Sequence, residues 1–410
     1  MHRMRVLRPP VLAAVIALCC AAPAAAKTPP AAASKAPAAA AAAGLATRTA
    51  AGQATRIAAA TRTAAALRAG RGGCTPMPVL SRSLADTSGR PMSAAGGGRA
   101  AAWNLVLGAA DGSRISVTAP PPGFRASSAT SRELSLLGLQ SAATRRLLAA
   151  AGAAGIRYVP AVGLCQLAGL SYGAQLHAGG NQSQNWAGPA LYAGGRHSRF
   201  FQVVAAFRQP RFRSSCAAVS DHAIWTGLGG YRGSDLIQAG TDSQAGSSGR
   251  SHAFAWFEII GLNRVEPPQE LDPARFPVTA GNRLLIQTSY RHGQMTFLFI
   301  NYGSRKYAVL TITRAYGHRA SYYYDGASAE VINERASTRS GFLQYRAPAG
   351  GRVSVLAAAF NGNQTAKSDG RYLHVLTMTS RPGGPALDEV GGVTSARTYS
   401  SWHDQWRRCS

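Results

Sequence analysis

The second half of the chain consists of short apolar runs separated by polar turns, which is typical of β-strands. From Asn185 onward, aromatic and β-branched residues become frequent, and glycine, proline and asparagine recur between the apolar runs. Residues 291–294 (RHGQ) predict a hairpin turn. The pattern predicts strands at residues 200–207, 253–259, 283–290, 295–301, 307–313, 328–333, 352–356 and 373–378. Because no helical period interrupts this series, the sequence predicts an all-β fold, an antiparallel β-sandwich or barrel.

Gln238 lies in the middle of another predicted strand, between apolar neighbours. Residues 223–230 (AIWTGLGG) and 234–242 (SDLIQAGTD) are predicted to be two strands joined by a glycine-rich turn. A glutamine at such a position needs hydrogen-bond partners if it is buried. Taken alone, this strand is therefore compatible with a satisfied polar residue that has no catalytic role.

The first 26 residues have the three parts of a secretory signal peptide. A basic start is followed by an apolar run from Val11 to Ala22 and by small residues around Ala26. The run is too short to span a bilayer. The sequence therefore predicts a secreted, extracellular protein with no membrane span.

Between the signal and the β-rich region the composition changes twice. Residues 27–73 are rich in Ala, Arg and Thr, have no apolar face, and are predicted to be a disordered leader. Residues 74–180 are predicted to be an N-terminal extension or pro-segment with strands near 103–107 and 113–117. The β-sandwich domain is expected at residues 181–385, followed by a C-terminal tail, residues 386–410.

One helix is expected within the extension. Thr130 and Glu133 have the spacing of a capping box, and leucine-rich sequence follows them. A short helix near residues 131–148 is the prediction.

Four cysteines remain after removal of the signal: Cys74, Cys165, Cys216 and Cys409. An even number in an exported chain predicts two disulfides, and the three possible pairings stay open. No cysteine belongs to a CxxC motif or a Cys/His cluster, so no metal site is expected.

The formal net charge is +27. Residues 1–180 carry 19 Lys and Arg against 3 Asp and Glu, and residues 181–410 carry 25 against 14. Such a balance can attract nucleic acid. The arginines are scattered singly, however, and no nucleic-acid-binding motif accompanies them, so nucleic acid is not expected as a partner.

Several kinds of catalytic site are absent from the sequence. It contains no HExxH and no phosphate-binding loop, and its GxSxG match, residues 169–173 (GLSYG), lies in a Gly- and Ala-rich stretch that is predicted to be loop. His222, His252 and His292 lie at predicted strand ends or turns and are expected at the surface. No cofactor is expected.

Five short segments contain the remaining candidate catalytic residues. They are residues 185–188 (NWAG), 224–230 (IWTGLGG), 236–242 (LIQAGTD), 255–258 (AWFE) and 329–334 (AEVINE). In this order they resemble motifs of the glutamic peptidases, the eqolisin family. Residues 120–124 (PPPGF) and the leucine-rich helix resemble the segment that precedes the catalytic domain in bacterial members.

The resemblance implies a sandwich of two large antiparallel sheets packed face to face, of the concanavalin-like or jelly-roll type. It implies a catalytic pair, Gln238 and Glu330, on the concave face of one sheet. It also implies that Trp186 and Trp225 line the substrate cleft, with the supporting polar residues Asp242 and Glu258 beside the pair.

The chemistry of such a pair is sound without the family. Peptide hydrolysis needs a base that takes a proton from water and an acid that returns one to the departing amine, and Glu330 can do both in turn. The amide of Gln238 can hold the water and donate a hydrogen bond to the oxyanion of the tetrahedral intermediate. The expected function is that of a secreted, acid-acting endopeptidase, a monomer whose partner is a protein or peptide substrate.

Two departures from the family pattern keep alternatives open. Gly229 replaces an aspartate, which questions the supporting polar network, and Val331 replaces a tryptophan, which is expected to alter the cleft. The loss of the aspartate at Gly229 favours the alternative of a catalytically inactive sandwich that binds peptide or glycan at the cell surface. A basic wall-associated structural protein is the third reading.

Overall fold

The computed structural model describes most of the chain from Cys74 onward. The residues described are 74–85, 102–108, 114–160, 163–167, 170–172, 177–179, 181–192, 199–212, 220–231, 233, 235–245, 251–261, 264–265, 267–291, 293–314, 324, 326–338, 341–345, 348, 351–361, 373–391 and 401–408. The predicted signal peptide and leader lie outside these residues, as do Cys216, Cys409 and His292.

One sheet, sheet A, contains the strands with the five motifs. Neighbouring strands along its main order run antiparallel. Their order is β1 (Cys74–Pro76), β6 (Cys165–Leu167), β16 (Gln269–Glu270), β14 (Ser251–Gly261), β13 (Leu236–Ala245), β12 (Ala223–Gly229), β20 (Ser328–Glu334), β9 (Trp186–Tyr192) and β25 (Leu373–Thr379). Short strands at its margin are β11 (Ser220–Asp221), β15 (Arg264–Val265) and β23 (Gln344–Tyr345).

The second sheet, sheet B, is also antiparallel along its main order. That order is β2 (Val79–Ala85), β3 (Ala102–Gly108), β4 (Arg114–Ala119), β19 (Lys306–Arg314), β18 (Gln294–Asn301), β17 (Arg283–Arg291), β10 (Gln202–Arg208), β24 (Arg352–Phe360), β27 (Trp402–Trp406) and β26 (Ala386–Gly391). β26 also pairs with β25, which belongs to sheet A. The two sheets are therefore joined at one end through β25. The remaining strands are β5 (Arg157–Tyr158), β7 (His177–Gly179), β8 (Gln182–Ser183) and the pair β21 (Ser337–Thr338) and β22 (Gly341–Phe342).

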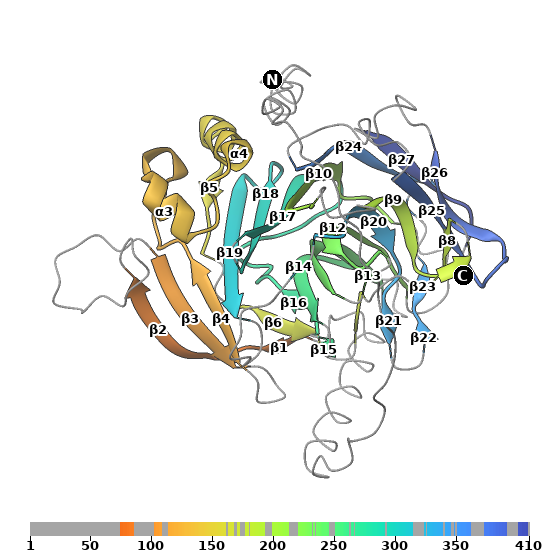
Figure 1. Cartoon of the computed structure of the whole chain (residues 1–410), viewed down its shortest axis with the longest axis horizontal. Coiled ribbons are helices and arrows are strands. Elements are labelled where there is room, and N and C mark those ends of the chain that lie inside the picture. The colour runs from red at the N-terminus through yellow and green to blue at the C-terminus, as the bar shows by residue number, and fades with distance from the viewer. Residues whose placement is uncertain are drawn as a thin grey trace, which may run out of the picture.

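This architecture confirms the predicted all-β sandwich (Figure 1). Every strand that was predicted in the second half of the chain is present, within a few residues of its expected ends. The hairpin between β17 and β18 forms as well, with Arg291 opposite Gln294.

The main core lies between the sheets. Sheet A contributes Ile237 and Phe257 to it, and sheet B contributes Ile286 and Phe297. The rings of Phe257 and Phe297 stack with their centroids 5.0 Å apart. Because side chains alternate along a strand, the residues next to these on sheet A point to its other face.

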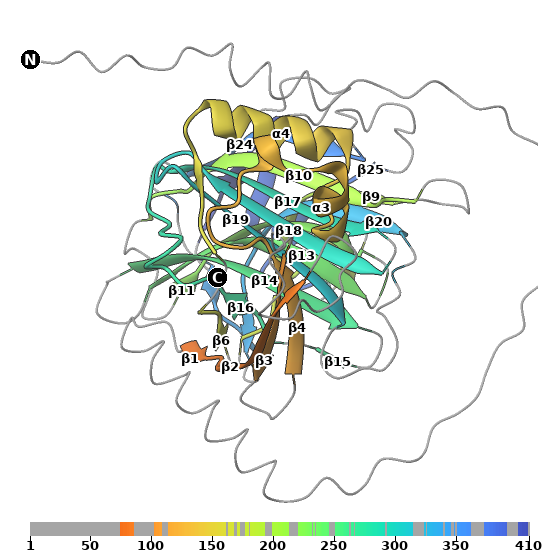
Figure 2. The same cartoon turned by 90° about the vertical axis from the view of Figure 1, so that its left-hand side faces the viewer.

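The extension packs on the outer face of sheet B through two helices. α3 (Ser131–Leu136) follows the 3-10 turn η1 (Ala126–Ser128), and α4 (Ala142–Ala153) lies across the strands in Figure 2. The predicted capping box forms between Thr130 and Glu133. The single helix predicted near 131–148 is two helices, however, because Gly138 has a positive φ of 66° and ends the first of them.

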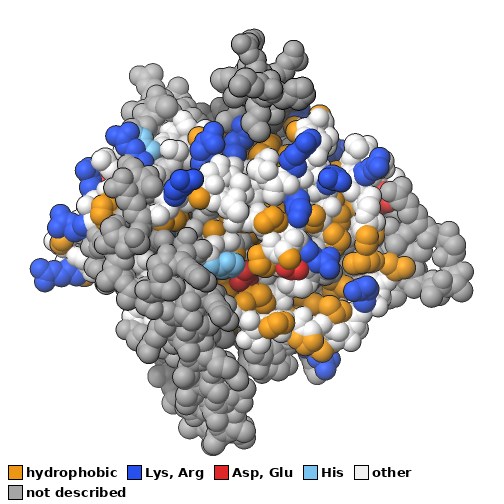
Figure 3. All heavy atoms as spheres, turned by 180° about the vertical axis from the view of Figure 1, so that it is seen from behind, with side chains coloured by type: hydrophobic (Ala, Val, Ile, Leu, Met, Phe, Trp, Pro, Cys, Tyr) orange, Lys and Arg blue, Asp and Glu red, His pale blue; other side chains and the backbone are white. Residues whose placement is uncertain are grey.

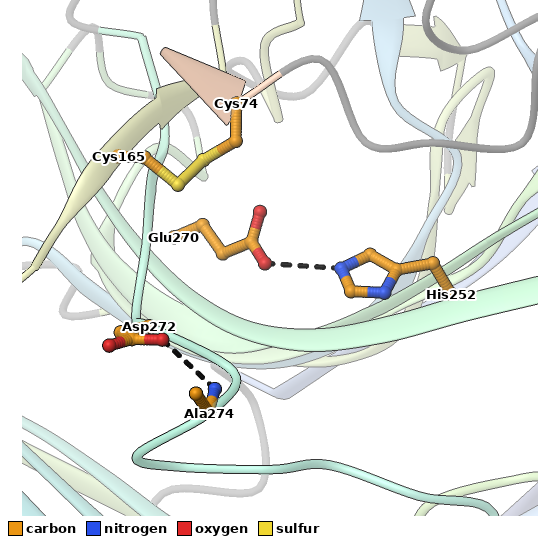
Figure 4. Close-up of a disulfide and its surroundings, with 6 residues drawn as sticks. All are labelled: Cys74, Cys165, His252, Glu270, Asp272 and Ala274. Carbon is orange, nitrogen blue, oxygen red and sulfur yellow. Dashed lines mark hydrogen bonds and ion pairs between the residues drawn. A yellow bond between two sulfur atoms is a disulfide. The ribbon is translucent and has the colours of Figure 1, made fainter. Parts of the chain in front are cut away.

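The extension also adds strands to both sheets. β4 pairs with β19 in sheet B, and β6 pairs with β16 in sheet A. A disulfide between Cys74 and Cys165 joins β1 to β6 beside Glu270 (Figure 4). At the other end, β26 and β27 lie in the region expected to be a tail and pair with strands of sheet B.

Two further properties bear on partners. Lys and Arg side chains are spread singly over the face in Figure 3 and form no continuous block among the residues drawn there. Within the described part of the chain, no helix is both long and apolar enough to cross a membrane.

Candidate active site

Gln238 and Glu330 lie in one row across sheet A. Gly227 on β12 is the register partner of both, Gln238 on β13 and Glu330 on β20. Directly paired residues share a face, so both side chains point to the face that is turned away from the main core. With strands about 4.8 Å apart, their Cα atoms are about 10 Å from each other. The row continues to Glu258 on β14, the partner of Gln238.

The amide of Gln238 is held by two acceptors. Its Nε2 donates to Oε2 of Glu258 at 2.8 Å and to the main-chain oxygen of Tyr172 at 2.5 Å. A carboxylate and a carbonyl can only accept, which requires the nitrogen of this amide to face both of them. One N–H is thereby fixed on a carboxylate while the other points at a peptide carbonyl.

Glu330 is fully buried, and its Oε1 accepts a hydrogen bond from the main-chain nitrogen of Tyr231 at 3.4 Å. Burial raises its pKa well above the usual value. The cause is desolvation, which disfavours the charged form of a carboxyl.

The two predicted cleft tryptophans lie beside this row. Their rings meet edge to face with centroids 4.9 Å apart, and both Trp186 and Trp225 are fully buried. Nε1 of Trp225 donates to Oε2 of Glu334 at 2.7 Å, and Nδ2 of Asn185 donates to Oε1 of the same carboxyl at 2.9 Å. Glu334 therefore fixes Trp225 from the strand that carries Glu330.

Asp242 lies two pleats from Gln238 on the same strand and is fully buried. Its Oδ2 accepts from the hydroxyl of Tyr172 at 2.5 Å and from Nε2 of Gln244 at 2.8 Å. Burial raises the pKa of Asp242. The structure thus brings all six predicted site residues to one face of sheet A, and Asp242 reaches Gln238 through Tyr172.

The two positions that differ from the family motifs have local explanations. Gly229 has a φ of 88°, and a Cβ there would lie 2.2 Å from the main-chain oxygen of Asp235. This backbone therefore has no room for an aspartate. Val331 pairs with Thr226 and packs into the main core, on the face opposite to Glu330. The expectation that Val331 alters the cleft was wrong, since neighbouring residues of a strand face opposite ways.

Three residues of this region were missed or misplaced. Tyr172 belongs to a Gly- and Ala-rich stretch that is predicted to be loop. Glu334 is the last residue of the motif 329–334, but it is not among the predicted site residues. His222 was expected at the surface, but it is buried, with its ring stacked 4.7 Å from that of Tyr345. Only the spacing of Glu334, four residues after Glu330 on one strand face, could have identified one of them in advance.

Metal chemistry finds no support in the described residues. Cys74, Cys165 and Glu270 come within ligand distance of one another, but the two sulfurs are joined in the disulfide (Figure 4). Oε1 of Glu270 bonds instead to Nε2 of His252 at 3.1 Å.

Comparisons with known proteins agree with the motifs. Residues 184–363 match the model of the Peptidase A4 family. Among solved structures, the chain is similar to scytalido-glutamic peptidase with a transition state analog inhibitor, with 14% identity and a TM-score of 0.41 over 55% of this chain and 98% of that one. It is also similar to SCP-B, a member of the eqolisin family, in a complex with the tripeptide Ala-Ile-His, at 14% identity, a TM-score of 0.40 and the same coverage. No curated protein matches the chain. Residues 184–363 thus match the Peptidase A4 family, and the protein is a glutamic-type peptidase, a hydrolase that acts on peptide bonds.

Proposed function

We propose that this protein is a secreted endopeptidase that acts in acid and uses Glu330 and Gln238 as its catalytic pair. One observation carries the assignment of the pair. The amide of Gln238 already donates to a peptide carbonyl, that of Tyr172, while Glu330 lies on the same face across a single glycine.

In the proposed reaction, water that enters the opened site relieves the desolvation of Glu330, so the carboxyl can ionise. Glu330 then takes a proton from a water molecule as the water oxygen attacks the carbonyl carbon of the substrate. The carbonyl π electrons move to oxygen, and the N–H of Gln238 stabilises the negative charge that forms there. Protonated Glu330 then gives its proton to the amide nitrogen. The C–N bond breaks, releasing a carboxylic acid and an amine.

Glu258 has a supporting part in this reaction. Its carboxyl holds one hydrogen of the Gln238 amide, so the second N–H keeps its direction without reorganisation. Preorganised donors of this kind are worth about 3 kcal/mol in comparable oxyanion sites.

Acid action is supported by the other carboxyls of this face. Burial raises the pKa of Asp242, and it raises the pKa values of Asp221 and Glu334 well above their usual range. The folded protein therefore favours the neutral forms of these carboxyl groups, and these are the forms that predominate in acidic solution. Secretion is supported by the signal-like first 26 residues and by a disulfide, which persists in oxidising compartments.

The test is hydrolysis of a denatured general protein substrate from about pH 2 to 7. Wild type is compared with Glu330→Gln and Gln238→Ala, each checked for intact folding by near-ultraviolet circular dichroism. The control is Glu389→Gln, since Glu389 lies on β26, outside the site, where it pairs with Arg407. Once the N-terminal extension has been processed, we expect cleavage in acid by wild type and by the control, and background rates from the two site variants.

Two results would contradict the proposal. Glu330→Gln retaining wild-type rates would remove the catalytic pair. A folded protein that hydrolyses nothing after its N-terminal extension has been processed would favour the alternative, a sandwich that binds peptide or glycan without cleaving it.

A further inference from the structure

The face that carries Gln238 and Glu330 is covered by a segment of the chain's own extension. Leu170 and Tyr172 are buried against sheet A, where they join the cluster around Trp225 and Trp256. Gln238, Glu330 and Tyr172 have no exposed surface. A substrate peptide cannot reach the pair while this segment is in place.

The segment binds through its main chain, as an added strand does. The main-chain nitrogen of Ser171 donates to the oxygen of Ser337 at 3.0 Å, and the nitrogen of Ser337 donates back to the oxygen of Ser171 at 2.8 Å. This antiparallel bridge is the pattern by which an extended peptide joins an exposed strand.

The next residue presents its peptide groups to the site. The nitrogen of Tyr172 donates to Oε2 of Glu258 at 3.1 Å, and its carbonyl oxygen accepts from Nε2 of Gln238 at 2.5 Å. The proposed mechanism requires this same contact between Gln238 and the carbonyl of a bond to be cleaved. The main chain of Tyr172 therefore lies where the main chain of a substrate would lie.

The side chain of Tyr172 fills a pocket that matches a phenol. Its ring stacks on Trp256 with centroids 3.9 Å apart and planes 16° from parallel. Its hydroxyl donates to Oδ2 of Asp242 at 2.5 Å. Desolvation by burial, together with the charge of Asp242, raises the pKa of Tyr172 well above 10, which keeps the hydroxyl a donor. The pocket thus has an aromatic wall for the ring and a buried acceptor for the hydroxyl.

We propose that this pocket selects tyrosine in substrates, at the residue whose carbonyl Gln238 binds, and that Ser171 and Tyr172 occupy it as a substrate mimic in the uncleaved chain. This inference rests on the proposed function, because it names the substrate preference of the same site. Phenylalanine would leave the Asp242 oxygen without its buried donor. An unsatisfied polar group of this kind disfavours binding by about tenfold or more.

The test measures binding, which does not depend on hydrolysis. The parent protein is the full chain with Glu330→Gln, which keeps peptides intact. The peptides are acetyl-Leu-Ser-Tyr-amide, which copies residues 170–172, and its phenylalanine analogue. Affinities are measured by calorimetry. We expect the added change Tyr172→Gly to tighten binding of the tyrosine peptide at least about tenfold, and this variant to prefer tyrosine over phenylalanine by a similar factor.

Three variants distinguish an effect of the pocket from a general loosening of the fold. Asp242→Ala, added to the uncovered protein, should bring the tyrosine-to-phenylalanine ratio close to one, and Asp242→Asn should keep part of it because an amide oxygen still accepts. Tyr158→Gly removes a tyrosine from the extension on the sheet B side, where its hydroxyl donates to the oxygen of Pro120. It should leave peptide binding as in the parent.

The inference is overturned if the uncovered protein binds neither peptide, binds both equally, or if Tyr158→Gly has the effect of Tyr172→Gly. Should Tyr172→Gly fail to fold, Tyr172→Phe takes its place. This change deletes only the hydroxyl, so it should weaken the covering contact and tighten binding of the tyrosine peptide by a smaller factor, and unchanged binding would overturn the inference. Selective binding by these variants, with no hydrolysis when Tyr172→Gly is made in the protein that keeps Glu330, would contradict the proposed function and leave the pocket assignment standing.

Discussion

Gln238 and Glu330 are separated by one glycine, because each is the register partner of Gly227 from opposite sides of β12. The indole of Trp225 occupies the space above that glycine. A Cβ at Gly227 would lie 2.4 Å from Cζ3 of Trp225, closer than a real contact allows. The pair and its neighbouring tryptophan thus depend on the absence of a single methyl group.

Gly227→Ala should therefore displace the Trp225 ring and weaken its hydrogen bond to Glu334. We expect a loss of about 1–3 kcal/mol in the free energy of unfolding, as for other overpacked cores, and loss of most peptidase activity. Urea unfolding and the substrate assay measure the two effects. Gly152→Ala is the control, since a Cβ at Gly152 in α4 meets nothing within 4 Å and alanine favours a helix by about 0.5–1 kcal/mol. Equal stabilities for the two variants would contradict the packing argument.

Glu258→Gln tests whether this carboxyl positions Gln238. The substituted amide can present a nitrogen to Nε2 of Gln238 and thereby turn the catalytic amide away from the substrate carbonyl. We expect kcat to fall about tenfold or more, while KM changes less, because oxyanion stabilisation is lost mainly in the transition state. Glu270→Gln, on the neighbouring strand β16, is the control. A change confined to KM would show that Glu258 only binds substrate.

Stability should be greatest in acid. Burial raises the pKa values of Glu334 and Asp404 well above their usual range, and it raises the pKa of Asp388 to about 7. Below about pH 3 these groups are neutral in both the folded and unfolded states, so their burial imposes no penalty. As the pH rises, the unfolded chain releases their protons first, and the free energy of unfolding falls. Calorimetric Tm values at constant ionic strength should therefore decrease between about pH 4 and 7.

Asp388→Asn should flatten this decrease, because it removes one of the groups that titrate in that window. A Tm that rises from about pH 4 to 7 in the wild type would contradict the argument. So would an unchanged slope in the variant.

The disulfide should stabilise the fold and hold the covering segment near the site. Cys74 and Cys165 are 91 residues apart in sequence, and closing a loop of that length restricts the unfolded chain by about 4–5 kcal/mol in the chain-entropy model. Changing both cysteines to serine should lower the free energy of unfolding by an amount of that order. Since Cys165 lies seven residues before Tyr172, the variant should also bind the tyrosine peptide more tightly. Binding equal to that of the parent would mean that β6 stays in place without the disulfide.

Much of the fold could be predicted because the signals for its strands and turns are local in the sequence. Strand residues alternate with a period of two, and the hairpin that follows Arg291 is marked by its turn sequence. The same alternation gives the side chains of Gln238 and Glu330 definite faces. Their placement in one row needed the motifs in addition, since register between strands distant in sequence is not encoded locally.

The rest depended on tertiary contacts. Tyr172 lies in a stretch without periodicity. Its position follows from partners 70 and 86 residues further along the chain, Asp242 and Glu258, and from the bridge between the preceding residue, Ser171, and Ser337. Gly138 gave no clear signal either. The left-handed turn there brings its backbone against Thr296 of sheet B, with no room for a Cβ, and this ends α3 inside an otherwise helical pattern.

The extension reaches both outer faces of the sandwich, with β4 and β6 paired into the two sheets and α4 packed on sheet B. A single backbone cut between Tyr172 and β8 would therefore divide the polypeptide without dividing the molecule. The N-terminal piece would persist as a light chain, held by sheet hydrogen bonds and apolar packing rather than by a peptide bond. Maturation of such a protein would show as two bands on a denaturing gel and as one particle of unchanged size in solution.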